Sequence, residues 1–197
     1  MVSKGLHRIE TSRADSSSVS FPVYTPLVDQ AAHKYGPSSS QTTAALREAD
    51  SFVRSLQSTI SAYNATHLVD LVVVSDHGMT TTSNDKLIYL DEILGEDLLN
   101  QIYAIDGWPS AGLHFKGASE KEQEASLDRA EKLLKEAAMT VGAGKAFWVY
   151  RKEELPVRWR IKENRRIAPL WVVPKLPWSI TSKDEMKSFN GQYEPVG

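Results

Sequence analysis

The most constraining feature of the sequence is a nearly continuous run of β-branched and other apolar residues at Leu68–Ser75. Such a run is typical of a parallel strand that is covered on both faces of a sheet. It follows a helical pattern at Gln41–Tyr63, where apolar residues recur every three or four positions. An alternating segment at Phe21–Val28 precedes that helix and predicts another strand. Strand, helix and buried strand together predict a right-handed βαβ unit.

The rest of the chain continues this alternation of strand and helix patterns, which favours an α/β fold with a sheet carrying helices on both faces. Residues 1–20 are rich in serine, and we expect them to be poorly structured. Residues 21–197 show no obvious linker, and we expect them to form one folded region. The further predicted elements are a short strand or turn leading into a helix at Leu87–Leu94, a turn at Asp106–Ser110, strands at Gly112–Phe115, Phe147–Tyr150, Ile167–Val173 and Trp178–Thr181, a short element at Glu153–Leu155 and an amphipathic helix at Ser119–Ala138.

Polar side chains follow both predicted strands at their carboxyl ends, where ligands gather in open α/β sheets. Asp29 and His33 follow the first strand, and Asp76 and His77 follow the buried one. If the two strands are neighbours, two carboxylates and two imidazoles converge at one edge, a donor set suited to zinc and less well to manganese. Each pair also has a simpler interpretation. Asp-x-x-x-His is common, Asp76 could cap a turn, and His77 could be a hydrogen-bonded core histidine.

The absence of cysteine from all 197 residues limits the chemistry available. It excludes disulfide scaffolds, thiolate metal sites and a thiol nucleophile, so a metal must be held by His, Asp, Glu or hydroxyl oxygen. The formal net charge is -2, so the chain lacks the excess of positive charge that attracts nucleic-acid backbones. We therefore expect no nucleic-acid partner.

Two longer motifs carry a resemblance to a known family. They are Val28–Pro37, which reads VDQAAHKYGP, and Val72–Met79, which reads VVVSDHGM. Over about residues 22–197 the sequence resembles the type I phosphodiesterase/nucleotide pyrophosphatase family of the alkaline phosphatase superfamily. It is most similar in character to fungal members of that family. Further matching stretches are Ile88–Asp91, Asp106–Ser110, Asn164–Pro169 and Val173–Lys175.

The resemblance implies an alkaline-phosphatase-like sheet and a site with two zinc ions. Asp29 and His33 would bind one ion, and Asp76 and His77 the other. It also implies hydrolysis of nucleotide-type phosphodiester or pyrophosphate bonds, by attack of a threonine on phosphorus through a phosphoryl-threonine intermediate. Two metal ions suit this chemistry because they activate the nucleophile and neutralise the phosphoryl oxygens.

The sequence departs from the family pattern at three places. Ala32 stands where the family usually has glycine before the histidine. Neither Thr11 nor Thr25 has the context of the nucleophile, so we assign no catalytic residue. The chain ends at Tyr193–Gly197, about where the family brings its last metal-ligating histidine in a Gly-x-His-Gly-Tyr segment. We therefore expect an incomplete catalytic domain with two ligands per zinc and weak or no activity.

Two alternatives stay open, a non-catalytic relic and another hydrolase or mutase of the same superfamily. The remaining histidines, His7, His67 and His114, are weak candidates for ligands. Trp108 and Tyr89 could line a substrate pocket, although aromatic residues in such places more often belong to the core. Lys175 and Arg166 could meet phosphate, although surface basic residues are usually only solvated.

Cellular location is not determined by the sequence. Members of the resembled family are commonly membrane-anchored or secreted, which would give meaning to the glycosylation sequon at Asn64–Thr66. The chain shows no signal-peptide pattern and no apolar run near the roughly 20 residues that span a bilayer.

Overall fold

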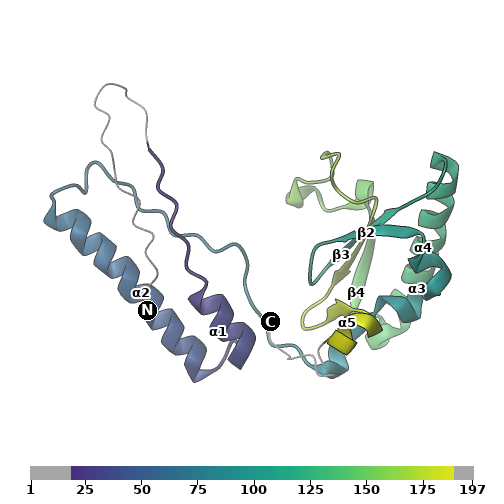
Figure 1. The fold of residues 1–197 in the computed structure, drawn as a ribbon, viewed down its shortest axis with the longest axis horizontal. Helices are drawn as coiled ribbons and strands as arrows, with labels where there is room; N and C mark the ends of the chain where they lie inside the picture. The colour runs from purple at the N-terminus through teal and green to yellow at the C-terminus, as the bar shows by residue number, and fades with distance from the viewer. Residues whose placement is uncertain (1–18, 189–197) are drawn as a thin grey trace.

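A computed structural model of the chain describes residues 19–188, and the predictions for residues 1–18 and 189–197 lie outside the described residues. Figure 1 shows the chain in two parts, a pair of helices and a sheet with its own helices. An extended segment after the helical pair joins them. The predicted α/β class is confirmed. None of the helices in residues 19–188 is long and apolar enough to cross a membrane.

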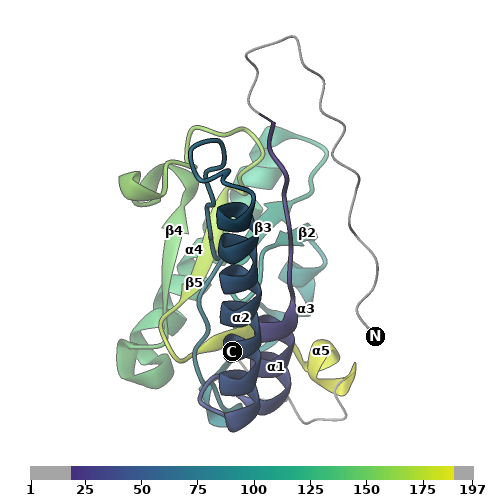
Figure 2. The same cartoon turned by 90° about the vertical axis from the view of Figure 1, so that its left-hand side faces the viewer.

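The helical pair consists of α1 (Leu27–Tyr35) and α2 (Ser40–Ala62), which lie side by side in Figure 2. The prediction of a helix at Gln41–Tyr63 is confirmed. Its periodic positions from Ala49 to Ile60 are the partly buried ones, while their neighbours are exposed. The apolar stripe of α2 is therefore the face least open to solvent.

The strand predicted at Phe21–Val28 is wrong. Residues 19–26 have no regular structure, and Leu27 already belongs to α1. Pro26 occupies the N-cap, and Asp29 in the first turn is favourable at the positive end of the helix dipole. Alternation alone does not make a strand, because a strand also needs a neighbour to accept its backbone hydrogen bonds.

The strand predicted at Leu68–Ser75 is also wrong, and with it the βαβ unit. These residues run without regular structure, and all are exposed. Val72, Val73 and Val74 have relative exposures of 76%, 67% and 84%. Within residues 19–188 no strand pairs with this run. A strand buried on both faces requires two neighbours and two covering layers, and the described part of the chain places neither beside it.

The main sheet has four antiparallel strands in the order β2-β3-β5-β4. The predicted strands at 112–115, 147–150 and 167–173 are confirmed, the last one beginning three residues later than expected. The prediction missed β2. The strands are β2 (Ile102–Asp106), β3 (Ala111–Phe115), β4 (Phe147–Arg151) and β5 (Leu170–Pro174).

A second, smaller sheet pairs β1 (Leu87–Tyr89) with β6 (Ser179–Thr181) in parallel. The predicted elements at 87–94 and 178–181 are therefore confirmed. Three α-helices and four short 3-10 turns complete this part of the chain. They are α3 (Leu90–Leu99), α4 (Glu120–Thr140), α5 (Lys183–Ser188), η1 (Asn84–Lys86), η2 (Val141–Gly144), η3 (Lys152–Glu154) and η4 (Val157–Trp159).

The hydrophobic core lies between one face of the main sheet and helices α3 and α4. The predicted helix at Ser119–Ala138 is confirmed, with Ser119 as its N-cap accepting a hydrogen bond from the backbone N–H of Glu122. Its apolar face buries Leu127, Ala130 and Leu134. The sheet contributes buried side chains from three strands: Ala111, Leu113, Phe115, Phe147, Leu170 and Val172.

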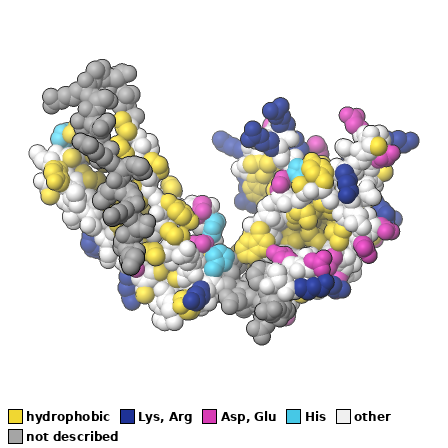
Figure 3. All heavy atoms as spheres, in the orientation of Figure 1, with side chains coloured by type: hydrophobic (Ala, Val, Ile, Leu, Met, Phe, Trp, Pro, Cys, Tyr) yellow, Lys and Arg dark blue, Asp and Glu magenta, His cyan; other side chains and the backbone are white. Residues whose placement is uncertain are grey.

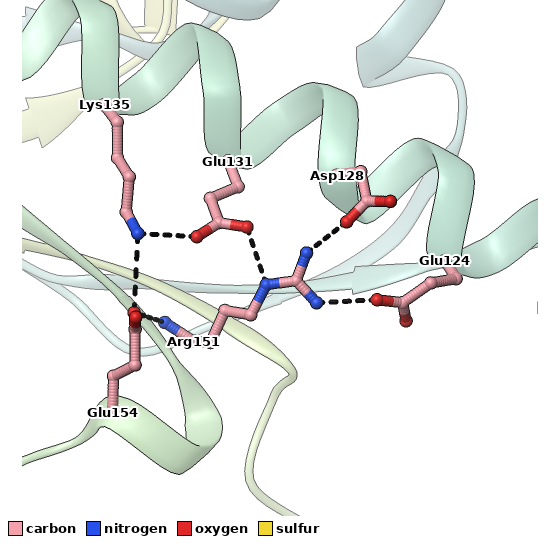
Figure 4. Close-up of polar contacts among 6 residues, drawn as sticks. All are labelled: Glu124, Asp128, Glu131, Lys135, Arg151 and Glu154. Atoms are coloured by element: carbon pink, nitrogen blue, oxygen red, sulfur yellow. Dashed lines mark hydrogen bonds and ion pairs between the residues drawn. The ribbon is translucent and has the colours of Figure 1, made fainter.

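An ionic cluster fastens α4 to the end of β4 (Figure 4). The guanidinium of Arg151 donates to Glu131 at 2.6 Å, to Glu124 at 2.6 Å and to Asp128. Lys135 donates to Glu131 at 2.6 Å. Burial alone would raise the pKa of the Glu131 carboxyl, but the hydrogen bonds from Lys135 and Arg151 outweigh it and lower that pKa.

We predict that Arg151→Met lowers the free energy of unfolding by about 2 kcal/mol, because Glu131 is left with only 17% of its side chain exposed and loses a charged hydrogen-bond partner. Urea denaturation measures the change. The control is Arg54→Met, whose ion pair with Asp50 is mostly exposed and is worth about 0–0.5 kcal/mol.

The pH dependence of this difference tests its cause. Because the folded-state pKa of Glu131 is lowered, its contribution is complete above the ordinary value of 4.5 and is lost as the pH falls through the lower folded value. The gap between the wild-type chain and Arg151→Met should therefore narrow at acidic pH. A gap that stays constant from neutral pH to well below 4.5 would assign the loss to apolar packing of the arginine stem instead.

Candidate metal site

Helix α1 places Asp29 and His33 one turn apart on the same face, because residues four apart on a helix are neighbours. The Nε2 atom of His33 lies 3.3 Å from Oδ1 of Asp29. Sequence reasoning put this pair at the end of a strand. The structure puts it on a helix, which brings the two side chains together equally well.

The extended segment that follows α2 returns Asp76 and His77 to this face of α1. The Nε2 atom of His77 lies 3.7 Å from Oδ1 of Asp29 and 3.8 Å from Oδ1 of Asp76. Figure 3 shows histidine side chains next to acidic ones between the helical pair and the sheet. The structure thus brings the two predicted pairs together, with the Asp29 carboxylate within 4 Å of both imidazoles.

The ring of His77 is oriented by its own loop. Its Nδ1 atom lies 2.7 Å from the carbonyl oxygen of Gly78. A carbonyl only accepts, so Nδ1 carries the proton in this contact, and in the neutral ring Nε2 keeps its lone pair on the side of Asp29. The bond to Gly78, with the nearby carboxylates of Asp76 and Asp29, raises the pKa of His77. Protons therefore compete for His77 at a higher pH than for an ordinary histidine.

The donor set consists of two carboxylates and two imidazoles, with no sulfur. Oxygen and nitrogen ligands of this kind suit zinc. A hydrogen bond from the second ring nitrogen of a histidine to a carbonyl is also the usual arrangement around metal-binding histidines. Within residues 19–188, however, no three or more side chains of His, Asp or Glu are already grouped closely enough to hold an ion. The residue types fit a metal, and the geometry is that of ion pairs.

The turn between α1 and α2 holds the site helix in place. The hydroxyl of Thr42, which is only 3% exposed, donates to the carbonyl of Gly36 at 2.8 Å. Ser39 Oγ donates to the same hydroxyl at 2.9 Å and accepts from the backbone N–H of Thr42. Gly36 has a φ of 88°, which favours glycine. The buried role of Thr42 was not visible in the sequence.

The other sequence candidates lie in different surroundings. Trp108 is next to the site, with its ring centroid 6.3 Å from that of His33. Tyr89 packs against the buried cluster of Leu87 and Met186. His67 is exposed at the start of the extended run.

Two further candidates have partners within the sheet region. His114 pairs with Asp106 at 2.6 Å, across β2 and β3. Lys175 donates to the carbonyl of Gly144 and lies over the ring of Trp148. Both contacts give these side chains a structural role. Arg166 is exposed, and His7 lies outside the described residues.

Comparison with known proteins gives consistent matches. The sequence profile of the family described as type I phosphodiesterase / nucleotide pyrophosphatase matches residues 14–197. An uncharacterized pyrophosphatase/phosphodiesterase of Schizosaccharomyces pombe is 32% identical over 174 residues, which is 88% of this chain and 34% of that protein. The bis(5'-adenosyl)-triphosphatase enpp4 of Xenopus laevis is 30% identical, over 87% of this chain and 34% of that protein.

Solved structures agree with the sequence matches. Human ectonucleotide pyrophosphatase/phosphodiesterase 5 has a TM-score of 0.62 at 29% identity, covering 78% of this chain and 37% of that one. The inactive murine protein of the same name, in complex with AMP, has a TM-score of 0.60 at 28% identity and covers 80% and 38%. The similarity confirms an alkaline-phosphatase-like fold for part of a domain. The chain spans about a third of the length of the curated relatives it matches.

We predict that Thr42→Val loosens the turn that holds α1. Valine keeps the shape of the side chain but leaves the Gly36 carbonyl and the Ser39 hydroxyl without this partner, at a cost of about 1–2 kcal/mol. Native-state hydrogen exchange measures the opening free energy of the α1 and α2 amides. The matched control is Thr43→Val, which removes an exposed bond to the Ser39 carbonyl and should cost about 0.5 kcal/mol or less. Equal effects of the two variants would contradict a special role for the buried hydroxyl.

Proposed function

Since the chain belongs to the type I phosphodiesterase/nucleotide pyrophosphatase family, we propose that it carries part of the metal centre of a hydrolase that cleaves nucleotide-type phosphodiester or pyrophosphate bonds. In this proposal Asp29 and His33 bind one zinc ion, and Asp76 and His77 bind the other. Residues 21–197 are then part of the catalytic domain.

The observation that supports the proposal best is the position of the Asp29 carboxylate. Its Oδ1 atom lies 3.3 Å from Nε2 of His33 and 3.7 Å from Nε2 of His77. Two separate parts of the chain thus bring ligand atoms of the right type close together, as two neighbouring ions require. An ion entering there would replace the ion pairs with coordination bonds, since histidine binds a metal in its neutral form.

Bound zinc would supply charge to neutralise phosphoryl oxygens and to activate a nucleophile. The four proposed ligands would hold that charge in position. The bond from His77 Nδ1 to Gly78 fixes the ring, and the Ser39–Thr42 turn fixes α1.

The proposed substrate is a small nucleotide. One structural neighbour was solved with AMP, and one relative is named as a diadenosine triphosphatase. Among the described residues, Trp108 offers an aromatic ring beside His33 that a base could contact. For the 197-residue chain itself we expect little or no turnover, because each ion has two protein ligands and no threonine matches the family's nucleophile.

We predict that the full chain binds Zn²⁺ in isothermal titration calorimetry, and that Asp29→Asn weakens binding by about tenfold or more. The amide keeps the shape but lacks the charge shared by both histidines. Asp50→Asn, which removes an exposed carboxylate on α2, should leave the affinity unchanged. If Asp29→Asn and Asp50→Asn bind zinc alike, the proposed site is wrong.

An assay of the zinc-loaded chain separates the functional alternatives. We expect at most slow release of p-nitrophenol from a p-nitrophenyl nucleotide diester, and none from a p-nitrophenyl sulfate. Rapid, metal-dependent diester cleavage would contradict our expectation that the chain lacks some of the metal ligands and the nucleophile needed for catalysis. Preference for the sulfate would favour another branch of the superfamily, and zinc binding with no turnover at all would favour a non-catalytic role.

A further inference from the structure

A strongly basic segment, residues 157–166, lies within the connection from β4 to β5, far along the chain from the metal-site residues. Between Val157 and Arg166 its only acidic residue is Glu163. In Figure 1 the loop projects beyond the sheet, and Figure 3 shows Lys and Arg side chains gathered there. We call this segment the basic loop. Its cations are Arg158, Arg160, Lys162, Arg165 and Arg166.

The cations of the basic loop are available to a partner. All four arginines are exposed, and Lys162 is partly exposed. The ion pairs formed among residues 19–188 involve none of them. This contrasts with nearby Arg151, whose guanidinium is taken up by three carboxylates of α4. The loop therefore keeps an excess of positive charge that no ion pair of the described residues takes up.

The backbone of the basic loop is tightly turned, so the positions from which its cations project are defined. The N–H of Trp159 donates to the carbonyl of Pro156, and the N–H of Arg160 donates to that of Val157. Arg160 has a φ of 55°, an unusual value for arginine. Further on, the side-chain oxygen of Asn164 accepts the N–H of Arg166 at 3.0 Å. Little backbone entropy therefore remains to be lost when such a loop meets a partner.

An apolar residue stands among these charges. Val157, at the start of η4, is 74% exposed, and its neighbours along the chain are Pro156 and Arg158. Trp159 is partly buried and meets Tyr150 edge-on, with ring centroids 6.0 Å apart. The loop thus combines exposed cations on a turned backbone with an exposed valine that no side chain of the described core covers.

We propose that the basic loop docks this part of the chain onto an anionic lipid surface. Charge complementarity carries the argument, because each Lys or Arg near a membrane containing anionic lipid favours binding by about fivefold. Val157 then enters the interface, where burial of an apolar side chain adds to the electrostatic attraction. A projecting turn can approach a flat surface with all of its cations.

A nucleic-acid strand fits these observations less well. Single strands are bound through aromatic rings that stack on bases along a positively charged groove. The aromatic residue within the basic loop, Trp159, is engaged with Tyr150.

The test is vesicle flotation of the full chain at low and high salt. Vesicles of phosphatidylcholine with about a third phosphatidylserine should carry the chain, and phosphatidylcholine alone should not. The double variant Arg165→Gln/Arg166→Gln should bind anionic vesicles about 25-fold more weakly. The charge-matched control Lys121→Gln/Arg129→Gln on α4, whose side chains are exposed, should bind like the wild-type chain. Val157→Ser should weaken binding even where all cations are kept.

Three results would overturn the proposal. They are equal binding to neutral and anionic vesicles, equal losses in the two double variants, and preference for a single-stranded oligonucleotide over anionic vesicles. Circular dichroism of each variant confirms that it is folded, so that a loss of binding reports on the loop itself.

Discussion

The structure depends on the cover that helix α4 gives to one face of the antiparallel sheet. This is the place where apolar side chains of the described chain are removed from water in quantity. Leu113, Leu134 and Leu170 are fully buried there, and burial of apolar area is the main favourable term in folding. The Arg151 cluster fixes how α4 lies on the sheet, because its hydrogen bonds join α4 to the end of β4. The second sheet and α3 are built onto the same core.

The helical pair and the extended run have no comparable cover. Of α1 and α2, only Ala32 and Thr42 are buried, and the valines at 72–74 face solvent. The candidate metal site lies in this second region. Its geometry is held by local contacts, namely the Ser39–Thr42 turn and the hydrogen bond between His77 and Gly78. The core can therefore tolerate changes at the site, and the site can shift without opening the core.

Local signals made α2 and α4 predictable, whereas α1 was missed and the strands depended on pairing that is not local in the sequence. Ser39 and Ser119 are N-caps followed by apolar residues at helical spacing, so α2 and α4 could be placed from the sequence. A strand also needs a partner, which no sequence pattern names. Leu68–Ser75 has strong strand propensity and no pairing strand among the described residues. The missed strand β2 has a mixed sequence, but β3 lies beside it and accepts its hydrogen bonds.

The convergence of the site residues was foreseen for a reason that did not hold. Two parallel strand ends were expected to bring Asp29 and Asp76 to one edge, whereas a helix and an extended segment bring them together. The i, i+4 spacing of Asp29 and His33 is compatible with a helix and with a strand end, so the sequence alone does not decide between them. An ion bound here would stabilise the arrangement that holds its ligands, by a free energy that rises with the logarithm of its affinity for that arrangement. Zinc affinity therefore measures how far the Ser39–Thr42 turn and the His77–Gly78 bond have already organised these ligands.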